Sequence, residues 1–124
     1  MEHYFDLALE ASGVSIAMDN HILGRATKRD YQNIVSLSER LHNIAGNHES
    51  AYDLIIAGTI WRDREYWKGK TREDVKLKTW LLAKDLESFS EFPEERQKEI
   101  RDVCVRLSIK AMSYSIPFMP KFAA

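Results

Sequence analysis

Glycine and proline are scarce in this sequence, with five and three among 124 residues. β-Strands are usually bounded by turn residues and alternate polar with apolar side chains, and no segment of the sequence combines the two features. Apolar residues instead recur every three or four positions along most of the chain, which is the spacing of an amphipathic helix. The sequence therefore predicts an all-α protein with short connections between its helices.

Cys104 is the only cysteine. A single thiol excludes an intrachain disulfide and a cluster of thiolate metal ligands. Cys104 falls within an expected helix and beside valines, where a thiol normally packs as a small apolar side chain. A chain so poor in cysteine suits a reducing compartment, and we expect a cytoplasmic protein.

Long apolar runs are absent as well. A membrane-spanning helix needs about 18 or more predominantly apolar residues, and no run of that length occurs. Residues 1–24 lack the basic start of a signal peptide, and Asp6 and Glu10 interrupt their apolar positions. We therefore expect no membrane association.

The charges nearly balance. The 18 basic and 19 acidic residues leave a formal net charge of -1 at pH 7, so the chain as a whole has no electrostatic attraction for nucleic acid or anionic lipid. The composition, 44% hydrophobic and 30% charged, is that of a globular protein. Its length fits a single helical domain over residues 1–124.

Capping residues divide the chain into about five helices. Thr27 with Asp30, and Thr71 with Asp74, have the spacing of a capping box at a helix N-terminus. Gly24 suits a helix C-terminus. Short links between helices predict a bundle of antiparallel neighbours. The expected helices cover residues 2–23, 28–46, 48–67, 72–89 and 93–115, and the proline-containing tail 116–124 is expected to be irregular.

Each expected helix carries one apolar stripe that we assign to the core, because its members share a face at helical spacing. The third stripe takes up most of the aromatic residues in the charged stretch 58–70, so that stretch is interpreted mainly as core. The stripes are, in chain order, Tyr4, Leu7, Ala11, Val14, Met18 and Ile22; Tyr31, Ile34, Val35, Ser38, Leu41 and Ala45; Tyr52, Ile55, Ile56, Thr59, Ile60, Tyr66 and Trp67; Val75, Thr79, Leu82, Leu86 and Phe89; and Ile100, Val103, Cys104, Leu107, Ala111 and Tyr114.

Three of these helices carry a second apolar face. Trp61 lies opposite the third stripe, near Leu54, and Trp80 lies off the fourth stripe, with Leu77 on a further side. A helix that is apolar on two faces is either central in its domain or contacts another subunit, and a domain of this size has room for about one central helix. We therefore expect Trp61, Leu54, Trp80 and Leu77 to bind a partner, which is another protein or a second copy in a homodimer. The second face of the last helix holds Val105, Ile109, Met112 and Ile116.

A basic stretch suggests an alternative function. Residues 58–84 hold eight basic and four acidic side chains with aromatic residues between them, a mixture that can bind phosphates and stack bases. A solvated corner between two helices explains the same mixture, and the balanced net charge favours that interpretation. The candidate phosphate contacts are Arg62, Arg64, Lys68, Lys70, Arg72 and Lys76.

Catalytic motifs are missing. The sequence has no HExxH, GxSxG, GxGxxG or phosphate-binding loop. His42, His48 and Glu49 surround a glycine turn but provide too few converging ligands for zinc, so we expect no metal and no cofactor. Asp63 falls within the third apolar stripe, where a carboxyl group can have a raised pKa, and it supports a second alternative, a small enzyme with an unrecognised acid site.

The pattern as a whole favours a small non-enzymatic protein that acts by binding another macromolecule. A short chain without catalytic motifs fits a regulatory, inhibitory or adaptor protein, and we associate it with bacteria or mobile elements.

Overall fold

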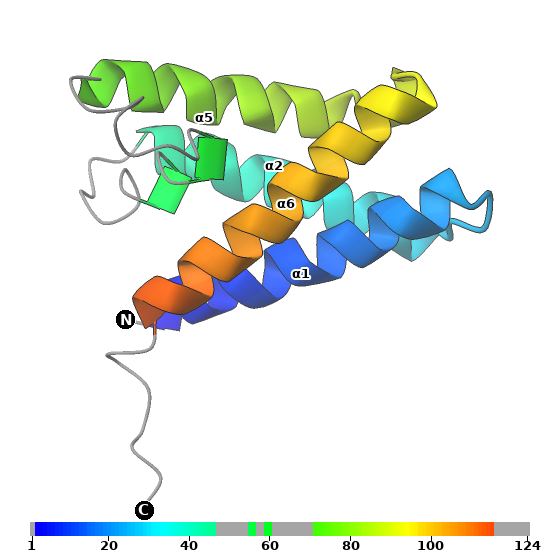
Figure 1. Ribbon diagram of the computed structural model, residues 1–124, viewed down its shortest axis with the longest axis horizontal. Coiled ribbons are helices and arrows are strands. Elements are labelled where there is room, and N and C mark those ends of the chain that lie inside the picture. The colour runs from blue at the N-terminus through cyan, green and yellow to red at the C-terminus, as the bar shows by residue number, and fades with distance from the viewer. Residues whose placement is uncertain (1, 47–54, 57–58, 61–70, 116–124) are drawn as a thin grey trace, which may run out of the picture.

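The computed structural model describes residues 2–46, 55–56, 59–60 and 71–115 (Figure 1). Within these ranges every regular element is helical and no strand is present, which confirms the all-α prediction. The described residues form four α-helices and a short 3-10 helix, rather than about five α-helices. The elements are α1 (Glu2–Ile22), α2 (Lys28–Gly46), α5 (Arg72–Glu87), η1 (Phe89–Glu91) and α6 (Glu94–Ser115).

The expected helix over 48–67 lies largely outside the described residues. Positions 55, 56, 59 and 60 of that segment are described, and all four are helical. Ile55, Ile56 and Thr59 are fully buried, as the third apolar stripe predicts. The Arg106 guanidinium of α6 donates a hydrogen bond of 3.2 Å to the Thr59 carbonyl, which joins Thr59 to α6.

Local capping chemistry sets the helix boundaries. Gly24 has a φ of 74°, and its amide donates to the His21 carbonyl while the Arg25 amide donates to the Asn20 carbonyl. This is the Schellman arrangement, in which glycine readily adopts the left-handed conformation that closes a helix. It ends α1 at Ile22, one residue before the predicted end.

Both predicted capping boxes are present. The Thr71 amide donates to the Asp74 carboxylate at 2.8 Å, and the Asp74 amide donates to the Thr71 hydroxyl at 3.2 Å. Thr27 and Asp30 make the same pair of contacts at the start of α2. Each box satisfies two backbone donors that a helix N-terminus otherwise leaves unpaired.

The predicted fourth helix ends early. It stops at Glu87, and Phe89 begins the 3-10 turn η1 instead of extending α5. Phe89 is buried, and its carbonyl accepts a hydrogen bond from the buried Gln97 side chain of α6. This contact fixes the reversal from α5 into α6.

The helices pair in two antiparallel couples (Figure 1). α1 packs most extensively against α6, and α2 packs against α5. The Ser108 hydroxyl donates to the Ala8 carbonyl at 2.9 Å, and Arg101 binds Asp19 at 2.7 Å, which sets the antiparallel register of α1 and α6. The α1–α2 hairpin links the two couples, and Arg40 binds Glu10 across it at 2.6 Å.

The core lies between the couples and confirms most of the predicted stripes. Besides Ile55 and Ile56, the buried apolar side chains common to prediction and structure are Leu7, Ala11, Val14, Met18, Ile34, Leu41, Ala45, Val75, Leu82, Leu86, Phe89, Ile100, Cys104, Leu107 and Ala111.

The stripe on α2 is displaced from its prediction. Tyr31 and Val35 are exposed, whereas Leu37, which the predicted stripe omits, is fully buried. Tyr31 and Val35 lie on one flank of α2 and Leu37 lies on the other, and all three are apolar at helical spacing. Periodicity alone therefore does not decide which flank of α2 turns inward. Packing against α1 and α5 decides it. Tyr114, at the edge of the last predicted stripe, is also exposed.

Candidate functional site

The outward side of α5 carries a cluster of exposed apolar side chains. Trp80 and Leu81 follow Leu77 by three and four residues, and the three side chains are between 40% and 54% exposed. The Lys84 ammonium lies 5.3 Å from the centre of the Trp80 ring, in the position of a cation–π contact. We call Leu77, Trp80 and Leu81 the α5 face.

This cluster is outward because the opposite side of α5 is used by the core. Val75, Leu82 and Leu86 are buried, and the Ala83 carbonyl accepts a hydrogen bond from Ser38 of α2. A helix that is apolar on two sides is either central in its domain or contacts another chain, and in the described part of the structure the outward side of α5 is exposed. The α5 face is that exposed side.

A groove continues from the α5 face toward α6. Leu81 also lines this groove, which has a volume of about 390 Å³ and contains Ile60, Leu82 and Val103. We call it the α5/α6 groove. Its charged lining consists of Lys78, Asp85, Arg96 and Arg106.

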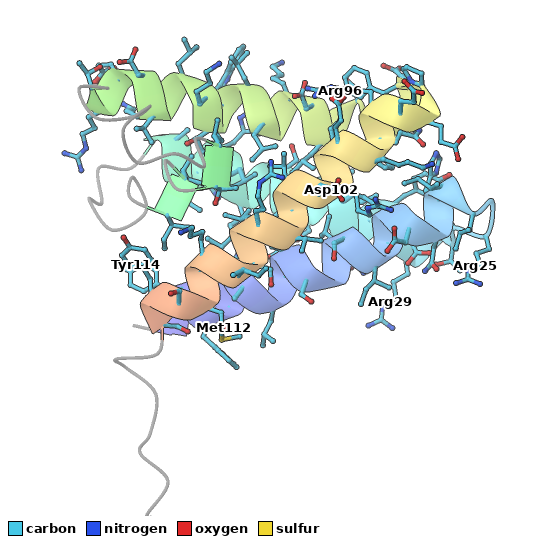
Figure 2. All side chains as sticks on the ribbon, viewed as in Figure 1. Arg25, Arg29, Arg96, Asp102, Met112 and Tyr114 are labelled. Atoms are coloured by element: carbon cyan, nitrogen blue, oxygen red, sulfur yellow. The ribbon has the colours of Figure 1, made fainter. Side chains whose placement is uncertain are left out.

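Ion pairs hold part of that lining in place. Arg96 points from α6 toward α5 (Figure 2) and binds Asp85 and Glu99, each at 2.9 Å. Arg106 is held by the Thr59 carbonyl. Three cations and one carboxylate therefore surround an apolar floor, and Arg96 among them is paired with two carboxylates.

Two of the four predicted partner-binding residues lie on this surface. Leu77 and Trp80 belong to the α5 face and are exposed, as contact residues of a partner need to be. Trp61 and Leu54 lie outside the described residues, and so does Trp67.

The predicted phosphate contacts are described at only two positions. Arg72 is exposed in the first turn of α5, and Lys76 is half-buried one turn later. Arg62, Arg64, Lys68 and Lys70 lie outside the described residues, and Asp63 does too. The structure thus places neither the full basic stretch nor the acid site that the enzyme alternative needs.

A second exposed apolar surface follows α1 and α6. Val105 and Ile109 of the predicted second face of α6 are exposed, and Met112 is half-buried. Figure 2 shows Met112 and Tyr114 leaving the last turns of α6 on different sides. Phe5, Leu9 and Ile16 of α1 are exposed as well, and the sequence analysis missed them. Their spacing of four and seven residues was the available signal.

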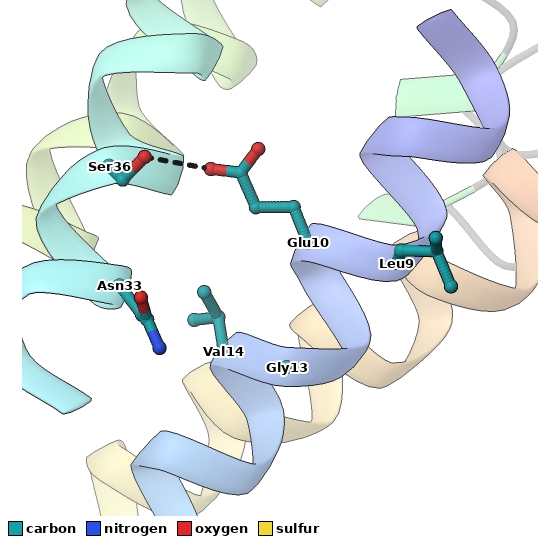
Figure 3. Close-up of a pocket in the computed structure, with 6 residues that line it drawn as sticks. All are labelled: Leu9, Glu10, Gly13, Val14, Asn33 and Ser36. Atoms are coloured by element: carbon teal, nitrogen blue, oxygen red, sulfur yellow. Dashed lines mark hydrogen bonds between the residues drawn. The ribbon is translucent and has the colours of Figure 1, made fainter. Parts of the chain in front are cut away.

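A small pocket opens between α1 and α2, beside the exposed surface of α1. It has a volume of about 320 Å³ and includes Leu9, Gly13, Val14 and Asn33. Figure 3 shows Glu10 at its edge, with a hydrogen bond from Ser36. The missing side chain of Gly13 contributes to the opening, since a Cβ there would meet no atom within 4 Å.

Groups suited to metal or covalent chemistry do not gather in the described ranges. No three His, Cys, Asp or Glu side chains among the described residues lie together as metal ligands. Burial raises the pKa of the Cys104 thiol to about 12, which leaves it protonated and unreactive at neutral pH. None of the described helices is both long enough and apolar enough to cross a bilayer.

Comparison of the chain with protein families, curated proteins and solved structures finds no match in any of the three.

Proposed function

We propose that the protein acts by binding another protein through the α5 face and the adjoining α5/α6 groove, in a regulatory, inhibitory or adaptor role. The observation that carries this proposal is the contiguous exposure of Leu77, Trp80 and Leu81 on one side of α5. Exposed apolar clusters that are bordered by polar groups are typical of protein interaction sites.

The side chains of the α5 face suit a binding hot spot. Tryptophan is enriched among the few interface residues that contribute most of the affinity, and such residues lie next to pockets that exclude water. Trp80 is a helical neighbour of Leu77 and Leu81, and Leu81 leads into the groove. An apolar side chain of a partner can enter the groove while its neighbours cover Trp80.

The charge around the groove indicates the chemistry of the partner. Lys78 lines the groove, and Lys84 lies over Trp80. A partner with acidic side chains around an apolar centre complements this arrangement, since opposite charges at the rim of an interface speed association and fix its orientation.

Two substitutions on α5 test the proposal. The parent and the variants Leu77→Ala and Trp80→Ala are each immobilised and exposed to an extract of the source cells. The proteins that the immobilised parent captures should not be captured by either variant. Trp80→Ala should weaken binding by about 2 kcal/mol, the scale of a hot-spot residue. Because both side chains are exposed, the thermal midpoint should hardly change.

Leu23→Ala is the matched control, since Leu23 is exposed at the far end of α1. It should retain the same proteins as the parent. Retention of those proteins by Leu77→Ala and Trp80→Ala contradicts the assignment to the α5 face.

A further inference from the structure

We propose that the exposed apolar surface along α1 and α6 binds a second copy of this chain in a two-fold dimer. The surface consists of Phe5, Leu9, Ile16, Val105 and Ile109, with Met112 at its edge, and we call it the α1/α6 face. It differs from the α5 face, so the proposal goes beyond the binding function given above and does not depend on it.

The two helices present their exposed residues on the same side of their contact. Ser108 meets Ala8, and Arg101 meets Asp19. At 100° per residue, Phe5 and Ile16 lie about 40 to 80° further around α1 from Ala8 and Asp19, on the side away from the core. Val105 and Ile109 lie outward of Ser108 and Arg101 on α6 by a similar rotation. The two stripes therefore join into one face.

The centre of this face carries no charge. Between Phe5 and Ile16 the exposed positions of α1 are Asp6, Leu9, Ser12 and Gly13. At 100° per residue Asp6 lies about 60° beyond Leu9, on the margin of the face away from α6. An ion-pair cluster closes one end of the face, where Arg101 binds both Asp19 and Asp102. An uncharged centre with charges at its margin is the usual arrangement of an interface.

The size of the apolar area favours a second copy. Phe5, Leu9, Ile16, Val105 and Ile109 are 38%, 53%, 59%, 39% and 62% exposed, which amounts to about 440 Å² of mostly apolar surface. A stable interface buries about 800 Å² on each partner, and in homodimers about 65% of that area is apolar. A homodimer interface therefore buries about 520 Å² of apolar surface on each partner. The apolar area that the α1/α6 face offers is of the same order.

The shape of the face also permits a two-fold arrangement. α1 and α6 are antiparallel, so a two-fold axis that lies in the interface and runs along the two helices lays α1 of one copy along α6 of the other in reversed direction. Such an interface is self-complementary and closed, which stops assembly at the dimer. Ser12, Gly13 and Ser108 near the centre are small and allow a close approach, and the pocket beside Leu9 (Figure 3) has room for an apolar side chain of the second copy.

The mass of the parent in sedimentation equilibrium tests the proposal first. We expect a mass of twice 14.4 kDa at tens of micromolar. Leu9→Glu and Ile109→Glu should each raise the dimer dissociation constant at least tenfold, because each places two charges in the interface, one from each copy. Leu77→Glu is the matched control, since Leu77 and Leu9 are 54% and 53% exposed, and it should leave the dimer intact.

Cross-linking locates the axis independently. Cys104 is buried and is the only cysteine, so an added exposed cysteine is the reactive one. Ser12→Cys should form a disulfide-linked dimer under mild oxidation, whereas Ser90→Cys, exposed in η1, should associate like the parent but form no disulfide between the two copies. A parent that sediments at 14.4 kDa, or a dimer that Leu77→Glu breaks as readily as Leu9→Glu, overturns the proposal. Neither result affects the retention experiment on the α5 face, whose readout is a different protein.

Discussion

The Ser38 hydroxyl of α2 donates a hydrogen bond of 2.8 Å to the Ala83 carbonyl of α5, and both groups are buried. It is a side-chain hydrogen bond that joins the two helices directly in the core. Ser38 belongs to the apolar stripe of α2, at a position where a larger side chain would push α2 and α5 apart.

Replacement of Ser38 by Ala should therefore lower the free energy of unfolding by about 1 kcal/mol, the usual net value of such a bond. Denaturant titration monitored by circular dichroism measures it. Gln32→Ala, in the same helix but exposed, should change stability by less than about 0.5 kcal/mol. Equal losses in the two variants would show that the bond to Ala83 contributes nothing.

Two glycines, one inside α1 and one just after its end, should respond in opposite directions to the same substitution. Gly13 lies inside the helix with open space around it, so Gly13→Ala should stabilise the protein by about 0.5 to 1 kcal/mol through helix propensity. Gly24 has a φ of 74°, so Gly24→Ala should destabilise it by about 1 kcal/mol, because a Cβ is strained in that region. Thermal melts of both variants decide the signs, and stabilisation by Gly24→Ala contradicts the Schellman assignment.

The thiol of Cys104 should be protected in the native protein. It is fully buried, and burial raises its pKa to about 12, so few molecules hold the reactive thiolate. A maleimide at pH 8 should label the parent only as the protein unfolds, at a rate that rises with denaturant. The exposed cysteine of Ser90→Cys should be labelled at once under the same conditions. Immediate labelling of the parent contradicts the buried placement.

Asp30 should titrate below its ordinary range. The hydrogen bond from the Thr27 amide, aided by the Thr27 hydroxyl and Asn20, holds the pKa of this carboxyl below its usual 3.8. Because the folded-state pKa is the lower one, the stabilisation is present above the ordinary pKa and is lost as the pH falls through the folded-state value. NMR titration should show this shift together with fraying of the first turn of α2.

The Thr27→Ala substitution should move the pKa of Asp30 back toward its ordinary value, since it removes the hydroxyl of the capping box. Thr71→Ala, which alters the equivalent box of α5, should leave the titration of Asp30 unchanged. An unaltered titration in Thr27→Ala would assign the shift to other groups.

The nucleic-acid alternative has its own test. We expect no saturable binding of short DNA or RNA at low salt, because the net charge is -1 and binding by phosphate contacts needs concentrated cations. If binding is observed, the triple variant of Lys68, Lys70 and Lys76 to Glu should abolish it and flatten its salt dependence. Such a result would replace the proposed protein partner with a nucleic acid.

The features that sequence reasoning located correctly are local ones. The capping boxes at Thr27 and Thr71 and the C-terminal glycine at position 24 involve contacts within a few residues, so their patterns place helix ends to within one or two positions. The end of α5 falls two residues before the predicted one, because the burial of Phe89 and its contact with Gln97 depend on α6 rather than on local sequence.

The orientation of helices that are apolar on more than one side could not be predicted in the same way. Tyr31 and Leu37 both fit a helical stripe, and only the positions of α1 and α5 decide that Leu37 turns inward. The exposed residues of α1 were missed for the same reason. Phe5 and Leu9 are as apolar as the core side chains, and periodicity does not show which apolar residues lack a neighbour.

The pairing of α1 with α6 has a consequence for how the chain reaches its native state. Ser108 meets Ala8 across 100 positions, and Arg101 meets Asp19 across 82. Helical proteins usually fold fast because their contacts are local, and contacts between distant parts of the chain slow folding. On the ribosome, α1 emerges long before its principal neighbour, with Leu7 and Met18 still uncovered. The nascent chain must keep that helix from aggregating until α6 has been synthesised.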